Sequence, residues 1–160
     1  MVKNFSTEWV LWFHSIKDNQ WNKSSYKRLY SIKSYLDYQL IIETFQQNHY
    51  QNGMFFIMKS DIFPNWEDPT NRMGGCLSFK IKSVNVINEW NKILLNCISE
   101  TIMKSDNDKI NGLSISPKKE FNIIKIWFSE DNIDYKEKYK EDKDSELILN
   151  NSMYKKHIID

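Results

Sequence analysis

The chain has 160 residues, of which 41% are hydrophobic and 27% are charged, proportions typical of a soluble globular protein. Its length allows one domain, 1–160, with a core large enough to need neither disulfides nor a metal. The formal net charge of +1 excludes the broad basic surface with which proteins hold long nucleic acids. Binding of a single group at the end of a nucleic acid chain is compatible with this small net charge.

Cysteine use and hydropathy indicate the compartment. Cys76 and Cys97 match neither a zinc-binding spacing nor a disulfide framework, which is typical of a reducing, intracellular environment. No apolar run is long enough to span a membrane, and residues 1–5 lack the apolar core of a signal peptide. We therefore expect a cytoplasmic protein without membrane association, cofactor or metal.

The first third of the chain is expected to form two strands and a helix. Residues 8–14 are aromatic and β-branched, which favours a strand, and residues 26–32 form the second strand. Ser34 is the predicted N-cap of a helix, with Asp37 three residues later in its first turn. The apolar residues of this helix recur on one face: Tyr38, Ile41, Ile42 and Phe45.

Two further strands, 53–58 and 76–81, are expected on either side of a loop, and a longer helix follows them. Ser83 is the predicted N-cap of that helix. Its apolar positions hold helical spacing and are assigned to the core: Ile87, Trp90, Leu94, Cys97, Ile98 and Thr101.

The last part of the sequence contains a predicted hairpin, with strands at 110–116 and 122–128, and a charged tail, 129–160. We expect the tail to be partly flexible, with a short helix near 135–141 and a last strand at 147–150. This order of elements indicates an α+β fold in one domain. Two to three helices lie on one face of a mainly antiparallel sheet, and the other face is free for a ligand slot.

One loop, 62–75, combines backbone constraints with unusual side chains. Its two prolines and its Gly74-Gly75 pair favour a loop of defined shape, and Trp66 stands directly before Glu67. A carboxylate can accept both hydrogen bonds of the Watson–Crick edge of guanine while an indole stacks on the base. The alternative is that Trp66 packs the loop onto the body and Glu67 is solvated.

The loop resembles the cap-slot loop of the translation initiation factor 4E family, whose members bind the 5′ cap of messenger RNA. The resemblance is carried by Pro64-Asn65-Trp66-Glu67-Asp68, by Asn71 and by Gly74-Gly75. It extends over 8–128, where Trp9, Trp12 and Phe13 match the family's first strand. It implies a curved sheet. A chain with no alanine and only two arginines suggests a divergent member from a virus or a protist.

The resemblance also implies how the base is held. Trp66 and Trp21, which lies in a polar loop after the first strand, are the two stacking planes, and Glu67 is the guanine acceptor. Trp127 meets the methylated edge of the base. For Trp127 alone, packing in the core stays open as an alternative, because it lies in an apolar run.

The cap phosphates require cations. Lys118 falls on the first basic position of the family's hairpin, with Lys119 beside it. Glu120 and Ile123 then stand where the family has lysines, and Cys76 stands where it has an arginine. Three other basic residues are candidates to compensate: Arg72, Lys155 and Lys156.

Three departures concern the helical face, on which the family docks a scaffold protein. The family's His-Pro-Leu segment, its helix Trp and its acidic residue are replaced here by Lys3-Asn4-Phe5, Gln39 and Lys92. We expect a divergent scaffold partner or none, and a monomer that acts within a complex with capped messenger RNA.

Three functions follow as alternatives. The first is cap binding as a translation initiation factor, and the second is a repressor that sequesters the cap. The third is an enzyme that hydrolyses a cap or nucleotide with Glu67 and Asp68. We favour binding without chemistry, because the sequence has no phosphate-binding glycine loop and no metal-binding spacing. The histidines have no evident partners: His14, His49 and His157.

Overall fold

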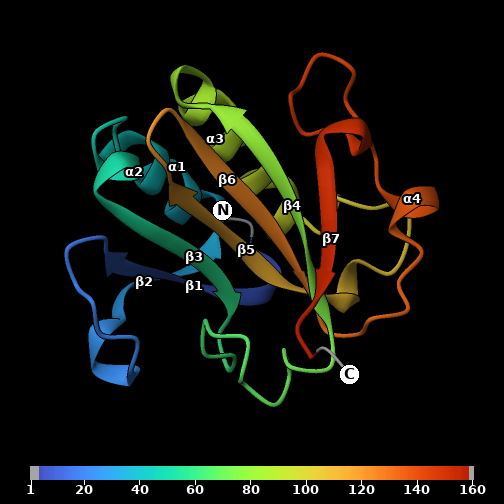
Figure 1. Cartoon of the computed structure of the whole chain (residues 1–160), viewed down its shortest axis with the longest axis horizontal. Coiled ribbons are helices and arrows are strands. Elements are labelled where there is room, and N and C mark those ends of the chain that lie inside the picture. Colours follow the sequence, from blue (N-terminus) through green and yellow to red (C-terminus); the bar gives the residue numbers. More distant parts are fainter. Residues whose placement is uncertain (1–3, 159–160) are drawn as a thin grey trace.

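One antiparallel sheet of seven strands forms the body of the protein (Figure 1). The computed structural model describes residues 4–158. The strands are β1 (Asn4–Ser15), β2 (Lys27–Ser34), β3 (Gly53–Lys59), β4 (Gly75–Lys82), β5 (Ile110–Pro117), β6 (Phe121–Phe128) and β7 (Ser152–Lys156). Their order across the sheet is β2-β1-β3-β5-β6-β4-β7, so β2 and β7 are the edges.

Helices cover one face of this sheet, and the opposite face faces the viewer in Figure 1. They are α1 (Tyr35–Thr44), α2 (His49–Asn52) and α3 (Val86–Ile98), and a short fourth helix, α4 (Tyr135–Lys138), lies beside the edge strand β7. The predicted α+β class, with a curved sheet open on one side, is confirmed. None of the helices within 4–158 is both long and apolar enough to cross a membrane.

Alternation along the strands creates two apolar clusters, one on each face. In β1, Trp9 and Leu11 point to the helices and pack in the main core with Trp90 of α3. Trp12 points the other way and packs in a smaller cluster on the open face. The buried members of that cluster are Tyr26, Phe56, Met58, Ile62, Cys76 and Trp127. The open face is therefore partly apolar before any ligand is considered.

The start of α1 is confirmed, and that of α3 is not. Asp37 accepts hydrogen bonds from the backbone N–H groups of Ser34, at 3.1 Å, and Lys33, at 2.8 Å, which satisfies donors at the helix start. The Ser83 hydroxyl instead donates to Oδ1 of Asn122 at 3.1 Å. A 3₁₀ turn, Ser83–Asn85, precedes α3. The tertiary contact with β6 competes with the local cap.

The end of α3 and the position of the last strand also differ from the prediction. Thr101 lies beyond α3, because Glu100 adopts a left-handed φ of 58° after the helix end. The last strand is β7, Ser152–Lys156, rather than 147–150. Leu147 is buried in the main core instead. Tyr154 of β7 stacks on Tyr135 with a ring-centroid distance of 5.2 Å. The strand is at the edge of the sheet and ends in two lysines, so its sequence lacks the apolar composition by which the other strands are predicted.

Candidate functional site

The β3–β4 loop, 60–74, is held in shape by its own polar side chains. The Asp68 carboxylate accepts hydrogen bonds from the backbone of Phe63 at 3.1 Å and Thr70 at 2.9 Å, and from the Thr70 hydroxyl at 2.6 Å. Burial opposes ionisation of Asp68, but these hydrogen bonds outweigh it and lower the pKa. Asp68 therefore remains an ionised structural group of the loop.

Asn71 fastens the loop to the sheet. Its side chain is fully buried, donates to the carbonyl of Asn65 at 2.8 Å, and accepts from the Asn111 amide of β5 at 2.8 Å. Next to it, Gly74 lies so close to β6 that an added Cβ would stand 1.8 Å from the Phe128 carbonyl oxygen. The loop is thus fixed at both β5 and β6.

This framework displays Trp66 and Glu67. The Trp66 side chain is 48% exposed, and Glu67 is exposed beside it. A half-exposed indole on a loop that is fixed by buried hydrogen bonds offers a flat, preorganised surface for stacking.

Trp21 is presented by the β1–β2 loop, 16–26, and is 57% exposed. The buried His14 ring stacks on it at 3.7 Å with an interplanar angle of 5°. The histidine is fixed in turn by contacts of its Nε2 with the Gln20 carbonyl at 2.7 Å and the Ser25 hydroxyl at 3.1 Å. His14, which has no evident partner in the sequence, therefore supports the Trp21 indole.

Tyr26 connects the two loops. Its ring lies 6.0 Å from Trp21 and 4.9 Å from Phe63 of the β3–β4 loop, and both loops lie at the lower edge of Figure 1. Burial raises the Tyr26 pKa to about 12, and the nearby Glu67 carboxylate adds to the rise. Trp21 and Trp66 thus come from neighbouring loops, although no ring contact joins the two indoles within the described residues.

A cleft of about 430 Å³ opens beside Trp66 on the open face. Trp127 of β6 lines it and is also buried in the open-face cluster, so packing in that cluster and a position beside a ligand are compatible for this side chain. Its indole N–H donates to the Ser114 hydroxyl at 3.0 Å, which fixes the ring. The cleft is lined by Trp66, Cys76, Ser78, Lys125, Trp127, Met153, Lys155, Lys156 and His157.

His157 forms one wall of the cleft. Its Nδ1 lies 2.7 Å from the Asn71 carbonyl, its Nε2 lies 3.1 Å from the Cys76 sulfur, and its ring centroid lies 5.2 Å from that of Trp127. Burial lowers the His157 pKa and raises the Cys76 pKa to about 12. Both groups are therefore neutral at pH 7, and this wall carries no charge.

Cations from β6 and β7 border the cleft. Lys155 and Lys156 line it, as does Lys125, which the sequence prediction omits. Strand alternation gives the missing signal, because Lys125 precedes Trp127 by two residues and so shares its face. Lys156 also lies 4.0 Å from the Asp131 carboxylate.

The other predicted phosphate ligands lie elsewhere. Lys118 and Lys119 lie at the β5–β6 turn, which Figure 1 shows near α2, far from the β3–β4 loop. Arg72 lines a separate shallow hollow with Gly74 and Asp131. The structure therefore brings together with Trp66 only two of the five predicted phosphate cations, Lys155 and Lys156.

The three substituted positions of the helical face lie apart from this cleft. Asn4 is exposed at the start of β1, Gln39 is half-buried on α1, and Lys3 lies outside the described residues. Lys92 on α3 pairs with Asp142 of the C-terminal tail at 2.9 Å. The side chain at the reversed charge is thus engaged within the chain.

The fold and the site define a class of protein: a seven-stranded antiparallel sheet backed by helices, with an aromatic, cation-bordered cleft on its open face. The model of the eukaryotic initiation factor 4E family matches residues 4–157, and the chain belongs to that family. It is 28% identical over 129 residues to eukaryotic translation initiation factor 4E of Saccharomyces cerevisiae, covering 76% of this chain and 60% of that protein. The Dictyostelium discoideum protein of the same name is 27% identical over 126 residues, covering 74% and 49%.

Solved structures share the fold. The complex of C. elegans eIF4E-3 with the 4E-binding protein Mextli superposes with a TM-score of 0.75 at 17% identity, covering 84% of this chain and 79% of that one. Ascaris suum eIF4E-3 with m7G cap gives 0.73 at 16% identity, covering 82% and 76%. The chain spans about 60% of the length of the yeast relatives it matches.

Proposed function

We propose that this protein binds the 7-methylguanosine 5′ cap of messenger RNA in the cytoplasm and acts in translation initiation. The observation that carries the proposal is the display of Trp66 and Glu67 on a fixed loop, beside a cleft that has Trp127 in its wall and lysines at its border. Each of these features corresponds to one part of a cap, which has a base, a methyl group and phosphates.

The methylated base fits between Trp21 and Trp66. Stacking contributes about 1–3 kcal/mol per base, and the positive charge of N7-methylguanine adds a cation–π attraction that unmethylated guanine lacks. Glu67 accepts the N1–H and the amino group of the base as a charge-assisted pair. The N7-methyl group then points to Trp127, whose indole is fixed by Ser114.

The phosphates are placed against lysines of the open face. Lys125, Lys155 and Lys156 are the cations that line the cleft, and we assign the main phosphate contacts to them. Lys118 and Lys119, which the family resemblance suggests, remain candidates for contacts further along the sheet. Arg72 borders the same end through the hollow that it shares with Lys156.

We propose binding without catalysis. Asp68, the second acid of the pair considered for an enzyme, accepts three hydrogen bonds within its own loop. A carboxylate that is fixed in this way is a poor base, because protonation would cost the loop those bonds. Glu67 is left to recognise the base.

A tryptophan fluorescence titration tests the proposal. We expect 7-methylguanosine triphosphate to quench fluorescence and to bind at least tenfold more tightly than guanosine triphosphate. Glu67→Gln should weaken binding by about 10- to 100-fold, because it loses a charge-assisted hydrogen-bond pair. Glu43→Gln, at an exposed position of α1, is the matched control and should bind like the wild type. Equal affinity for the two nucleotides would contradict the proposal.

A cap-sequestering repressor is the second candidate. It is favoured by the helical face, where Gln39 replaces the family's tryptophan and Lys92 is engaged by Asp142. Leu36 and Leu40 are exposed on α1 and offer apolar surface to which a divergent scaffold partner could bind. Recovery of the helicase-bearing initiation complex from a translation extract on a cap resin distinguishes the two, since a repressor leaves that complex behind.

A further inference from the structure

The two faces of the Trp21 indole have different surroundings. One face is covered by the His14 ring, which is fully buried and stacks on the indole in parallel with a centroid distance of 3.7 Å. The side chain is nevertheless 57% exposed, so the other face is open to a ligand. A base that stacks on this open face therefore has an ionisable ring on the opposite side of the same indole.

Hydrogen-bond acceptors surround the His14 ring. Its Nε2 lies 2.7 Å from the Gln20 carbonyl, and its Nδ1 lies 3.0 Å from the Ser15 carbonyl. A carbonyl oxygen can only accept a hydrogen bond. The Ser25 hydroxyl, 3.1 Å from Nε2, donates its proton to the Asn22 carbonyl at 2.7 Å, so it also accepts from Nε2. Both ring nitrogens thus face acceptors.

This arrangement distinguishes the two charge states of His14. A neutral imidazole has one N–H. Donation by Nε2 to Gln20 leaves the Nδ1 lone pair against the Ser15 carbonyl oxygen. A protonated imidazole donates from both nitrogens and satisfies both carbonyls. Because histidine ordinarily changes charge between pH 5 and 8, this site can accept a proton in mild acid and gain a hydrogen bond.

The groups that contact the His14 ring are uncharged. Among the described residues, no charged side chain bonds to it, and its neighbour on β3 is Met54. Tyr26, whose ring lies 5.0 Å away, stays neutral because burial raises its pKa to about 12. The charged side chains of the β1–β2 and β3–β4 loops and of the start of β2 are Lys17, Asp18, Lys23, Lys27, Asp61, Glu67, Asp68 and Arg72.

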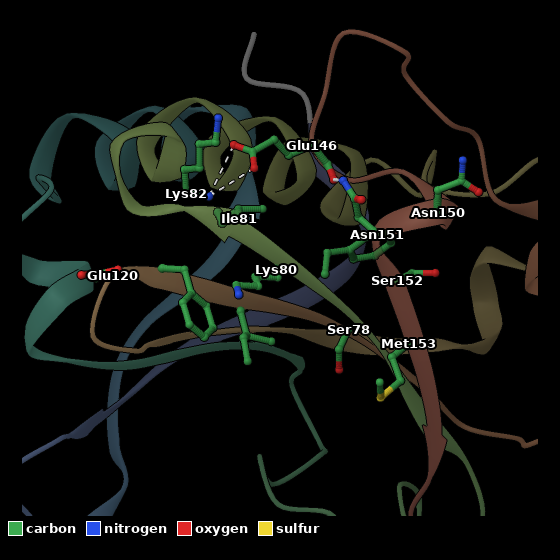
Figure 2. A pocket seen from close by; sticks show the side chains of 13 residues that line it. Ser78, Lys80, Ile81, Lys82, Glu120, Glu146, Asn150, Asn151, Ser152 and Met153 are labelled. Carbon is green, nitrogen blue, oxygen red and sulfur yellow. Dashed lines mark hydrogen bonds between the residues drawn. The ribbon is translucent and has the colours of Figure 1, made fainter.

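Other ionisable groups of the open face are separate from this ring. Glu120 and Glu146 line a hollow of about 810 Å³ where β4 approaches α3 (Figure 2), and Figure 1 shows this end of β4 away from the β1–β2 loop. His157 is a second histidine of the open face, but it lies against Trp127 and burial lowers its pKa. It therefore takes up a proton at a lower pH than an ordinary histidine.

A charge on His14 acts on a base stacked on the open face of Trp21. A stacked base lies at a van der Waals separation of about 3.5 Å from the indole. With 3.7 Å on the other side of the indole, the base is roughly 7 Å from the His14 ring. Two positive charges at this distance repel each other, and both depend on attraction to the same π-system. Protonation therefore weakens binding of a cationic base more than binding of neutral guanine.

We propose that His14 is a positioning residue whose charge sets the preference of the site for a methylated base. Neutral His14 leaves the π-system of Trp21 to the cationic base, and protonated His14 reduces the preference. The inference rests on the proposed function, because the base must stack on Trp21. It makes discrimination between methylated and unmethylated caps sensitive to acidification through a single buried residue.

The test measures the affinities of 7-methylguanosine triphosphate and guanosine triphosphate by tryptophan fluorescence at pH 7.0 and pH 5.5. The ratio of the two affinities is compared, because titration of the phosphates, which both ligands share, cancels in it. In the wild type the ratio should fall about fivefold on acidification. His14→Phe keeps a ring behind Trp21 without a charge, so its ratio should change less than twofold. His49→Phe, on α2, is the matched control and should behave like the wild type.

A wild-type ratio that is the same at both pH values would overturn the inference and leave the proposed function intact. An equal fall of the ratio in His14→Phe would also overturn it, and His157→Gln would then show whether the histidine of the cleft wall is responsible. Equal affinity for the two nucleotides at both pH values would overturn the proposed function as well.

Nitrogen-15 NMR of the histidine rings tests the charge state in the wild type, so this result does not depend on how a variant folds. His14 is identified by its contact with Trp21. We expect both of its ring nitrogens to carry protons at pH 5 and one of them to lose its proton as the pH rises to 8. A His14 ring that keeps one charge state over this range would overturn the inference.

Discussion

The His157 ring lies between Trp127 and the backbone of the β3–β4 loop, and its environment controls its charge. Burial lowers its pKa, and the positive charge of Lys125 acts in the same direction. Cys76, which it contacts, is held as a thiol by burial. A protonated His157 would place a positive charge in this wall of the cleft. It would also disturb the contacts that His157 makes with the Cys76 sulfur and with the Asn71 carbonyl of the β3–β4 loop.

The free energy of unfolding should therefore depend on His157. The unfolded chain takes up the proton near pH 6.5, and the folded chain does so only at lower pH. Between these two values the unfolded state binds more protons, so stability that is fully present above pH 6.5 is lost as the pH falls through this window. Urea unfolding at pH 7.5 and at pH 5.5 should show the loss, and His157→Gln should reduce it. The same loss in the variant would assign the effect to other groups.

At the scale of the element, hydrogen bonds to distant strands give the β3–β4 loop its shape. Asn71 links the loop to Asn111 of β5 at 2.8 Å and, through its carbonyl, to His157 at 2.7 Å. The same element contains the Trp66-Glu67 pair. Stability and ligand binding are therefore expected to change together when the loop is loosened.

Asn71→Ala tests this coupling. It should lower the free energy of unfolding by about 2–4 kcal/mol, because it removes buried hydrogen bonds and leaves the Asn65 and Asn111 partners unsatisfied. Binding of 7-methylguanosine triphosphate should weaken as Trp66 loses its fixed position. Asn132→Ala, at an exposed position, is the control in both urea unfolding and fluorescence. Unchanged stability of Asn71→Ala would show that the loop is held by its other contacts.

At the scale of the whole molecule, the charge is close to balanced, with a formal net charge of +1. Binding is therefore expected to depend on a few local lysines instead of a broad field. The cations that line the cleft come from β6 and β7, and those of the β5–β6 turn lie at the other end of the sheet.

The salt dependence of affinity measures this arrangement. With three lysines on the phosphates, the logarithm of the association constant for 7-methylguanosine triphosphate should fall as the logarithm of salt concentration rises, because salt screens these charge pairs. Lys125→Gln should make the slope shallower, because one charge pair is lost, and Lys118→Gln with Lys119→Gln should leave it unchanged. A shallower slope in the turn variant instead would support the assignment that the family resemblance gives to Lys118 and Lys119.

Patterns that act over a few residues were readable in the sequence. The prolines and glycines around Trp66-Glu67 predict the loop, a run of aromatic and β-branched residues predicts the first strand, and Ser34 with Asp37 predicts the start of α1. The resemblance to the 4E family rests on the same local run of residues, and the family match over 4–157 confirms it. These features depend on neighbours along the chain, so no knowledge of the fold is needed.

Contacts between distant segments were decided by the tertiary structure. His157 meets Cys76 and Asn71, His14 supports Trp21, and Lys125 joins the cleft, because strand order and loop folding bring these residues together. Competition between local and distant hydrogen bonds moved the start of α3 away from Ser83. The sequence determined which loop presents the indole and the carboxylate. The packing of the sheet determined which cations and supporting side chains surround them, since that depends on partners far apart in the chain.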